Sequence, residues 1–256
     1  MHILVTNDDG VTAPGLLSLA QAMRPLGRIT VLAPERNWTA GGHVKTLHRP
    51  LRVRPTRLDD GTQALTSDGA PSDCVALALL GLIEEKIDLV VSGINTNANM
   101  GHDITYSGTV TAAMEAVIAG VPGIAFSLVS PAEHQETLDY GPAGQIARTV
   151  VSTVLEQGLE KNTLLNVNIP YLQVEQMEGV QITRQGLRVY RDALDHRLDP
   201  RGRDYYWIGG EYPSGVAEDG TDIGAVEESF VSITPLQLDL TDYKLLDRLR
   251  DWRWEL

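Results

Sequence analysis

The N-terminal part of the chain alternates between short apolar runs and one amphipathic segment. Ile3–Thr6 is an apolar run, Pro14–Met23 carries apolar residues at helical spacing, and Ile29–Ala33 is a second apolar run. Two strands joined by a helix call for a right-handed crossover and lie parallel in one sheet. Strands of a parallel sheet are covered on both faces, so they read as continuous apolar stretches. The N-terminal half is therefore predicted to be α/β.

A similar order of strand-like and helix-like segments continues to about residue 169. The predicted elements are two extended pieces within 47–66, helices at 71–83, 108–119 and 143–156, and strands at 87–92, 122–129 and 164–169. This order predicts a mostly parallel sheet with helices on both faces, formed by residues 1–177.

The pattern loosens from residue 178 onward. Extended segments are predicted at 179–184, 203–208 and 228–234, followed by a short helix near Tyr243–Trp252. We therefore expect residues 178–256 to form an appendage of extended segments and a terminal helix. Its aromatic group, Tyr205-Tyr206-Trp207, is expected to pack on the main domain or on a second subunit.

The composition indicates which binding partners and which cellular compartment to expect. The formal charge of -13 repels polyanions, so long DNA or RNA is not an expected partner. The single cysteine, Cys74, allows no internal disulfide or multi-cysteine metal site, and we expect it to be buried rather than nucleophilic. The N-terminus lacks the features of a signal peptide, and the longest apolar run, Cys74–Ile83, is too short to span a bilayer. We expect a soluble cytoplasmic protein.

Three polar loops follow predicted strands. They cover residues 7–10, 34–46 and 92–108. In an open parallel sheet, ligands bind beyond the carboxyl ends of the strands, where such loops converge. We therefore look for the functional site in these three loops.

The acidic pair Asp8-Asp9 stands at the end of the first predicted strand. Two neighbouring carboxylates repel each other at a buried strand end unless a cation neutralises them. An isolated Asp-Asp-Gly would favour an ordinary turn or a helix cap. The position at a strand-to-helix junction, with oxygen-bearing side chains in neighbouring loops, favours a metal site instead, and the donors suit Mg²⁺ or Mn²⁺.

The loop at 92–108 leads into a helix that begins with Ser107, Gly108 and Thr109. Exposed N–H groups at a helix N-terminus, joined by two hydroxyl groups, can hold a phosphate without lysine. Alone, the Ser-Gly-Thr sequence would favour a helix cap, whereas the adjacent Asn-rich loop favours an anion site. His43 and His102 also lie in these loops, either as solvated side chains or as proton donors to a leaving group.

At these motifs the sequence resembles the survival protein SurE family of 5'/3'-nucleotidases, and the match extends over most of the chain. The order and spacing of the motifs make the resemblance specific. The matching residues are Asn7-Asp8-Asp9-Gly10, Ala13-Pro14-Gly15, Ala33-Pro34-Glu35-Arg36-Asn37, Ser92-Gly93-Ile94-Asn95 with Asn99, Gly101 and Asp103, Tyr106-Ser107-Gly108-Thr109-Val110, and Val231-Ser232-Ile233-Thr234-Pro235-Leu236 with Asp239.

The resemblance implies a Rossmann-like catalytic domain with one divalent metal ion per subunit. The four metal ligands of the family map to Asp8, Asp9, Thr39 and Asn95. The third ligand is usually serine, but the hydroxyl of Thr39 can still coordinate a metal. The family also implies hydrolysis of nucleoside monophosphates with Mn²⁺ or Mg²⁺, and C-terminal exchange that forms homodimers or homotetramers.

The resulting hypothesis is metal-assisted hydrolysis of a phosphomonoester. The residues expected to carry the reaction are Asp8, Asp9, Asn95 and Ser107, and those expected to bind the phosphate are Asn99, Ser107, Gly108 and Thr109. Two alternatives remain. One is a non-catalytic module that binds nucleotide or phosphate, and the other is a metal-dependent deacylase. Deacylase chemistry usually adds histidine ligands, and no histidine adjoins the acidic pair.

Overall fold

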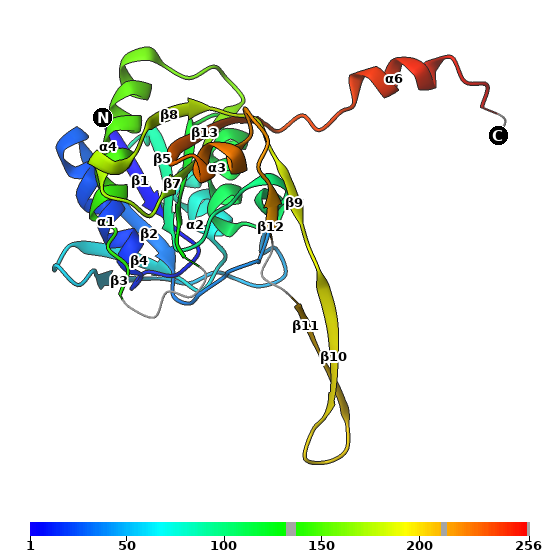
Figure 1. Cartoon of the computed structure of the whole chain (residues 1–256). Helices are drawn as coiled ribbons and strands as arrows, with labels where there is room; N and C mark the ends of the chain where they lie inside the picture. The colour runs from blue at the N-terminus through cyan, green and yellow to red at the C-terminus, as the bar shows by residue number, and fades with distance from the viewer. Residues whose placement is uncertain (132–136, 211–213, 255–256) are drawn as a thin grey trace.

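The computed structural model of the chain describes residues 1–131, 137–210 and 214–254. The strands of its main sheet are β1 (His2–Thr6), β2 (Arg28–Pro34), β3 (Val53–Arg57), β4 (Gln63–Ser67), β5 (Leu89–Asn95), β6 (Gly123–Val129), β7 (Thr163–Pro170), β8 (Gly179–Ile182) and β13 (Phe230–Gln237). Within this part of the chain their spatial order is β3-β4-β2-β1-β5-β6-β7-β13-β8 (Figure 1). The strands from β4 to β7 are parallel, which confirms the predicted α/β architecture.

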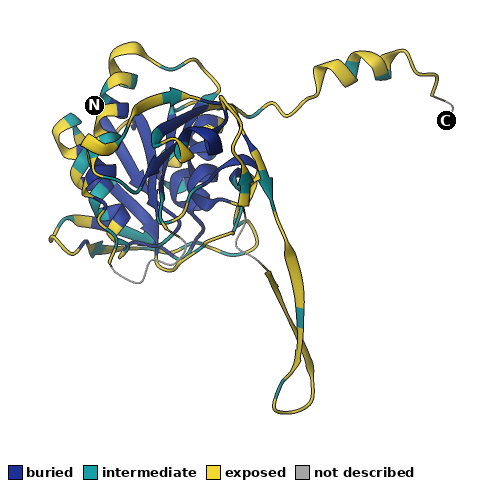
Figure 2. Cartoon of the chain, viewed as in Figure 1, coloured by how far each residue is buried: buried dark blue, intermediate teal, exposed yellow. Residues whose placement is uncertain are grey.

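Helices cover both faces of the sheet. The helices of the body are α1 (Pro14–Met23), α2 (Pro71–Leu77), α3 (Gly108–Ile118), α4 (Gly141–Gln157) and α5 (Asp222–Glu227), and a further helix, α6 (Tyr243–Arg250), lies outside it. Alternate residues of β1 join different apolar clusters. Ile3 and Val5 pack with residues of α1 and α4, whereas Leu4 packs with residues of α2 and α3. The continuous apolar run that predicted this strand therefore reflects burial on two sides, which Figure 2 shows as a dark core.

One helix prediction needs correction. The segment 71–83 was expected to be a single helix, but the regular helix α2 ends at Leu77. A wider, irregular turn follows at Ala78–Leu82, where Gly81 has a φ of 113° that interrupts helical geometry. Cys74 is buried within α2, as expected.

Two strands of the C-terminal part, β8 and β13, complete the main sheet. Strand β13 lies between β7, to which it is antiparallel, and β8, to which it is parallel. The predicted boundary after residue 177 therefore falls within one continuous sheet. The helix predicted at 243–252 is present as α6, and no residue of α6 is buried.

A long hairpin and the C-terminal helix project from the body (Figure 1). The hairpin consists of β10 (Asp192–Leu198) and β11 (Asp204–Gly210), and its base is formed by β9 (Leu187–Val189) and β12 (Ser214–Val216). The aromatic group Tyr205-Tyr206-Trp207 lies on β11 and is exposed, so it does not pack on the main body (Figure 2). Its packing against a second subunit stays a prediction.

Among the described residues, no helix combines the length and the apolar character that a membrane crossing requires.

Candidate functional site

Two neighbouring strands bring the predicted site residues together. Strand β1 pairs with β5, so the loop after Thr6 and the loop after Asn95 leave the same edge of the sheet. Helix α3 then begins against Asp8. A Cβ atom added at Gly108 would lie only 2.6 Å from the Cβ of Asp8. Glycine at position 108 therefore permits the close approach of the helix to the acidic pair.

Asp8 is the most deeply buried acidic side chain of the site, with 2% of its surface exposed. Its Oδ1 accepts a hydrogen bond from the hydroxyl group of Thr109. Burial raises the pKa of Asp8 to about 6, the Thr109 hydrogen bond opposes this rise, and the charge of Asp9 adds to it. A cation bound to this carboxylate would offset the cost of its ionisation.

Asp9 is partly buried, and burial raises its pKa as well. The hydroxyl of Thr96 donates to its Oδ2 over 3.3 Å, and the side-chain amide of Asn37 donates to its Oδ1 over 3.4 Å. Thr96 is itself within 3.0 Å of the hydroxyl of Tyr140. Neutral donors therefore surround a carboxylate that still lacks a cationic partner among the described residues.

The loop that carries Thr39 is attached to the acidic pair by its backbone and by Asn37. The N–H of Trp38 donates to the carbonyl of Asp8 over 2.8 Å, and the N–H of Thr39 donates to the side-chain oxygen of Asn37 over 2.6 Å. Asn37 thus connects Asp9 to Thr39. Asn37 was not among the predicted site residues, although it occurs in one of the matching motifs.

Asn95 is the last residue of β5 and Asn99 lies in the loop that follows, and the two residues differ in their surroundings. The amide N–H of Asn95 donates to the carbonyl of Asn97 over 2.6 Å, which leaves its Oδ1 as the atom suited to a metal. The amide of Asn99 donates to Ser127 over 2.7 Å, and the backbone N–H and carbonyl of Asn99 both bond to the side chain of Asn168. Asn99 therefore fixes the loop, and its role in phosphate binding stays a prediction.

Ser107 caps α3. Its hydroxyl oxygen accepts a hydrogen bond from the N–H of Val110 over 3.1 Å, and the residue is buried. This cap aligns the first turn of α3, where Gly108 and Thr109 approach Asp8. The arrangement places the predicted phosphate-binding turn and the predicted metal-binding pair side by side.

The two candidate histidines differ in position. The Nε2 of His43 lies 3.0 Å from a carboxylate oxygen of Glu115, in the second half of α3. Thr109 and Glu115 are six residues apart on this helix, which corresponds to about 9 Å along its axis. His102 is exposed on the 3₁₀ turn Gly101–Thr105. The structure thus holds His43 near Glu115 and leaves His102 exposed, and a role of either histidine as proton donor stays a prediction.

The donor set of the site fits a hard divalent cation. Asp8 and Asp9 supply two carboxylates with raised pKa values, and no ion pair within residues 1–131, 137–210 and 214–254 neutralises either one. In the same ranges no three His, Cys, Asp or Glu side chains cluster around a metal position. A cation bound here would take its remaining ligands from neutral oxygens, and the assignment of Thr39 and Asn95 to this role stays a prediction.

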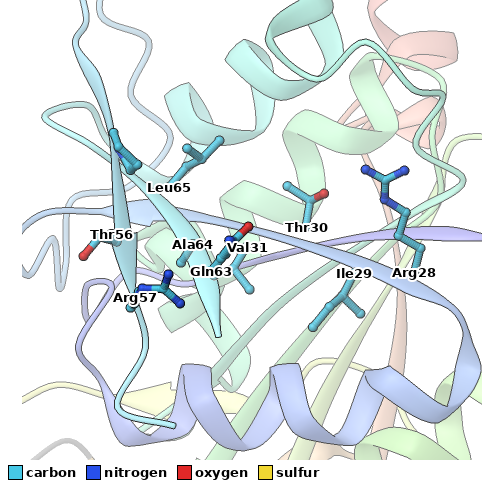
Figure 3. A pocket seen from close by; sticks show the side chains of 10 residues that line it. Arg28, Ile29, Thr30, Val31, Thr56, Arg57, Gln63, Ala64 and Leu65 are labelled. Carbon is cyan, nitrogen blue, oxygen red and sulfur yellow. The ribbon is translucent and has the colours of Figure 1, made fainter. Parts of the chain in front are cut away.

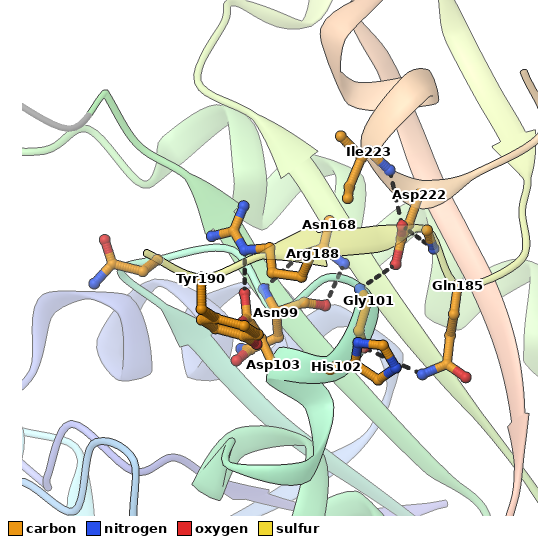
Figure 4. A network of polar contacts seen from close by, with 12 residues as sticks. Asn99, Gly101, His102, Asp103, Asn168, Gln185, Arg188, Tyr190, Asp222 and Ile223 are labelled. Atoms are coloured by element: carbon orange, nitrogen blue, oxygen red, sulfur yellow. Dashed lines mark hydrogen bonds and ion pairs between the residues drawn. The ribbon is translucent and has the colours of Figure 1, made fainter. Parts of the chain in front are cut away.

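A second network ties the loop after β5 to the C-terminal part of the chain (Figure 4). The carboxylate of Asp222 is fully buried and accepts N–H groups from Gly101, Gly186 and Ile223, each over 2.8 Å. The side chain of Gln185 adds a bond to the carbonyl of Gly101 over 3.1 Å. One buried carboxylate therefore joins three separate segments.

An ion pair reinforces this connection. The Nε of Arg188 lies 2.8 Å from a carboxylate oxygen of Asp103, and both side chains are largely buried (Figure 4). The hydroxyl of Tyr190 donates to the other carboxylate oxygen over 2.5 Å. The base of the projecting hairpin is thus joined to the turn that precedes Ser107.

A cavity of about 840 Å³ lies elsewhere, between β2 and the β3–β4 hairpin (Figure 3). It is lined by residues 28–31 at the amino end of β2 and by residues of β3 and β4. No predicted site residue lines it. Because ligands of parallel sheets bind at the carboxyl ends of strands, this cavity is not the candidate site.

Comparison with known proteins agrees with the motifs. The family model of Survival protein SurE matches residues 3–192. The "5'-nucleotidase SurE" of Chloroflexus aggregans is 51% identical over 100% of both chains, and that of Herpetosiphon aurantiacus is 51% identical over 99% of both. The crystal structure of Sure protein from Aquifex aeolicus has 40% identity, covers 98% of each chain and gives a TM-score of 0.81. The chain therefore belongs to the survival protein SurE family.

Proposed function

We propose that this chain is a divalent-metal-dependent phosphatase that hydrolyses nucleoside 5'- or 3'-monophosphates to nucleoside and phosphate. The observation that carries this proposal is the buried pair Asp8-Asp9 against the first turn of α3. Full-length relatives at 51% identity are named 5'-nucleotidase SurE, which supports a phosphomonoesterase that acts on nucleotides. The chain is accordingly a hydrolase of phosphoric monoester bonds.

Asp8, Asp9, Thr39 and Asn95 would hold one divalent cation per subunit, Mn²⁺ or Mg²⁺. When bound there, such a cation would supply polarisation of a phosphoryl oxygen and a lowered pKa of a bound water. The two carboxylates supply the charge. The hydroxyl of Thr39 and the amide oxygen of Asn95 supply neutral donors, and Asn37 holds the backbone of Thr39 in place.

The first turn of α3 binds and orients the phosphate in this proposal. Its N–H groups carry the partial positive charge of a helix N-terminus, and Ser107 keeps the turn ordered. Gly108 and Thr109 bring these donors next to the acidic pair. His102, which is exposed, would protonate the departing alkoxide.

A substrate panel tests the proposed function. Purified protein is incubated with 5'- and 3'-nucleoside monophosphates and with Mn²⁺, Mg²⁺ or EDTA, and released phosphate is measured. We expect release with Mn²⁺ or Mg²⁺, loss of release in EDTA, and recovery on readdition of the ion. Release that EDTA leaves unchanged, or no release with any ion, would contradict the proposal.

We also propose that the chain forms a homodimer or homotetramer through its C-terminal part. Residues 1–177 hold the catalytic core in this view, and residues 178–256 provide the assembly contacts. The exposed apolar side chains of the hairpin support this, because large exposed apolar groups are costly on an isolated subunit. They include Leu194, Leu198, Trp207 and Ile208.

A further inference from the structure

Glu115 is a buried carboxylate of α3 that the proposed reaction does not use. Its side chain is 5% exposed, yet two basic side chains of a single loop reach it. The Nζ of Lys45 lies 2.8 Å from Oε1, and the Nε2 of His43 lies 3.0 Å from Oε2. A buried carboxylate is costly unless it is paired, so Glu115 favours the loop conformation that brings these two groups to it.

The same loop is bonded to the N-terminal end of α3. The N–H of Gly42 donates to the carbonyl of Tyr106 over 2.9 Å, and the hydroxyl of Thr111, which donates to the carbonyl of Ser107 over 2.8 Å, lies 3.2 Å from the carbonyl of Gly42. The loop therefore follows α3 from the turn before its cap to Glu115. Contacts at both ends of this path hold the loop along the helix.

Thr39 lies just before this attached segment. On its other side, the N–H of Trp38 donates to the carbonyl of Asp8 over 2.8 Å. Thr39 is thus held between the acidic pair and the segment bound to α3. The helix itself is bonded to Asp8 through Thr109. Movement of the loop along α3 would change the position of Thr39 relative to Asp8.

We propose that Glu115 is a positioning residue that holds the Thr39 loop on α3 and thereby sets the affinity of the site for its divalent cation. The inference rests on the proposed function in one respect, since it takes Thr39 as a metal ligand. Glu115 acts through His43 and Lys45 and touches neither the cation nor the substrate. Residues that orient a metal ligand commonly alter metal affinity by roughly 10- to 100-fold when they are replaced.

The test compares wild type with Glu115→Gln by two measurements that need no turnover. Hydrogen exchange of the Trp38 and Gly42 amides is followed in EDTA-treated protein, and Mn²⁺ binding is measured by calorimetry. We expect faster exchange of both amides and a Kd for Mn²⁺ raised roughly tenfold or more. With nucleotide substrate, kcat at saturating Mn²⁺ should fall by a much smaller factor.

Variants of the loop provide the controls. Lys45→Met should change the amide exchange rates and the Mn²⁺ affinity in the same direction as Glu115→Gln. Lys45→Arg keeps the charge and should leave both quantities near those of wild type. Lys86→Met removes an exposed lysine paired with Asp88 over 3.4 Å and should change neither. Because Lys45 is half-exposed, its variants also provide the test if Glu115→Gln does not fold.

Two results would overturn the inference. One is wild-type exchange of Trp38 and Gly42 in a folded Glu115 or Lys45 variant, and the other is faster exchange with an unchanged Kd for Mn²⁺. Failure of the proposed function looks different: the wild-type protein would release no phosphate from nucleotides, while exchange and Mn²⁺ binding would still decide the role of Glu115.

Discussion

The hydroxyl of Thr109 donates a hydrogen bond to the carboxylate of Asp8, although the two residues are 101 positions apart in the chain. This bond joins the end of β1 to the first turn of α3. It also stabilises the ionised form of Asp8 against the effect of burial. The predicted metal-binding and phosphate-binding residues are therefore connected directly.

Thr109→Val should weaken both metal binding and catalysis. Loss of the hydroxyl removes a bond that lowers the pKa of Asp8, so protons compete more strongly with the cation near pH 6. A bond to a charged group is worth about 1.5–3 kcal/mol, which predicts a fall in kcat/KM of roughly tenfold or more. Steady-state kinetics across Mn²⁺ concentrations measures this. Thr109→Ser keeps the hydroxyl and should have a kcat/KM near that of wild type. An equal fall in kcat/KM in both variants would argue against a role of the hydrogen bond.

Asp8→Asn should remove hydrolysis while largely sparing nucleotide binding. The amide carries no charge to anchor the cation, so we expect phosphate release to fall by about 100-fold or more. Phosphate release and equilibrium binding of a nucleoside monophosphate are measured on the same sample. Asp59→Asn, at an exposed turn, is the matched control. Unchanged turnover in Asp8→Asn would remove this residue from the mechanism.

The stability of EDTA-treated protein should depend on the ionisation of Asp8. Burial raises the pKa of Asp8 from 3.8 to about 6, so the folded chain holds this proton more tightly than the unfolded chain. The resulting stability is fully present below pH 3.8 and is lost as pH rises through about 6, with a total loss of about 3 kcal/mol.

Urea unfolding of wild type and Asp8→Asn between pH 4 and pH 8 measures this effect. Carboxylates remote from Asp8 are common to both proteins and cancel in the comparison, whereas Asp9 is coupled to Asp8 and contributes to the difference. The free energy of unfolding of Asp8→Asn minus that of wild type should increase as pH rises. A difference that stays constant with pH would show that Asp8 titrates alike in the folded and unfolded states.

Asp222→Asn should loosen the junction between the loop after β5 and the C-terminal part. The carboxylate accepts N–H groups from Gly101, Gly186 and Ile223, whereas an amide offers one oxygen and two unwanted donors. We expect a loss of about 1–3 kcal/mol in the free energy of unfolding, measured with urea. Asp219→Asn, on the exposed surface, is the control. Equal stability of the two variants would contradict the proposed importance of this carboxylate.

Replacement of residues 192–210 by a short Gly-Ser linker should reduce the oligomer to a smaller species. The hairpin exposes apolar side chains that we assign to a subunit interface. Light scattering of the purified protein before and after the replacement measures the molar mass. A wild-type protein that is monomeric, or a variant with an unchanged mass, would refute this assignment.

Much of the sheet was predictable because its central strands are buried on both faces. The strand predicted at 164–169 matches β7 (Thr163–Pro170), and that predicted at 122–129 matches β6 (Gly123–Val129). A continuous apolar run is a local property, so these strands can be identified from the sequence alone. The pairing of β13 with β7 and β8 depends on chain segments far apart in sequence, and no local pattern predicts it.

The candidate site was also predictable from the sequence only in part. Asp8 and Thr109 were predicted to lie together because the carboxyl ends of neighbouring parallel strands share one edge of the sheet. The contact of Asn37 with Asp9 and the contact of His43 with Glu115 depend on the path of a long loop. Side-chain chemistry alone cannot predict such a path, so the sequence left the role of His43 open.

The position of β13 has a consequence for biosynthesis. Among the described strands, β8 pairs only with β13, which is translated much later. A nascent chain that has not reached residue 230 therefore has β7 as an unpaired edge and no partner for β8. Exposed edges invite association with other chains. Completion of the sheet must wait for the last part of translation, and this interval is when a chaperone would be of most use to the protein.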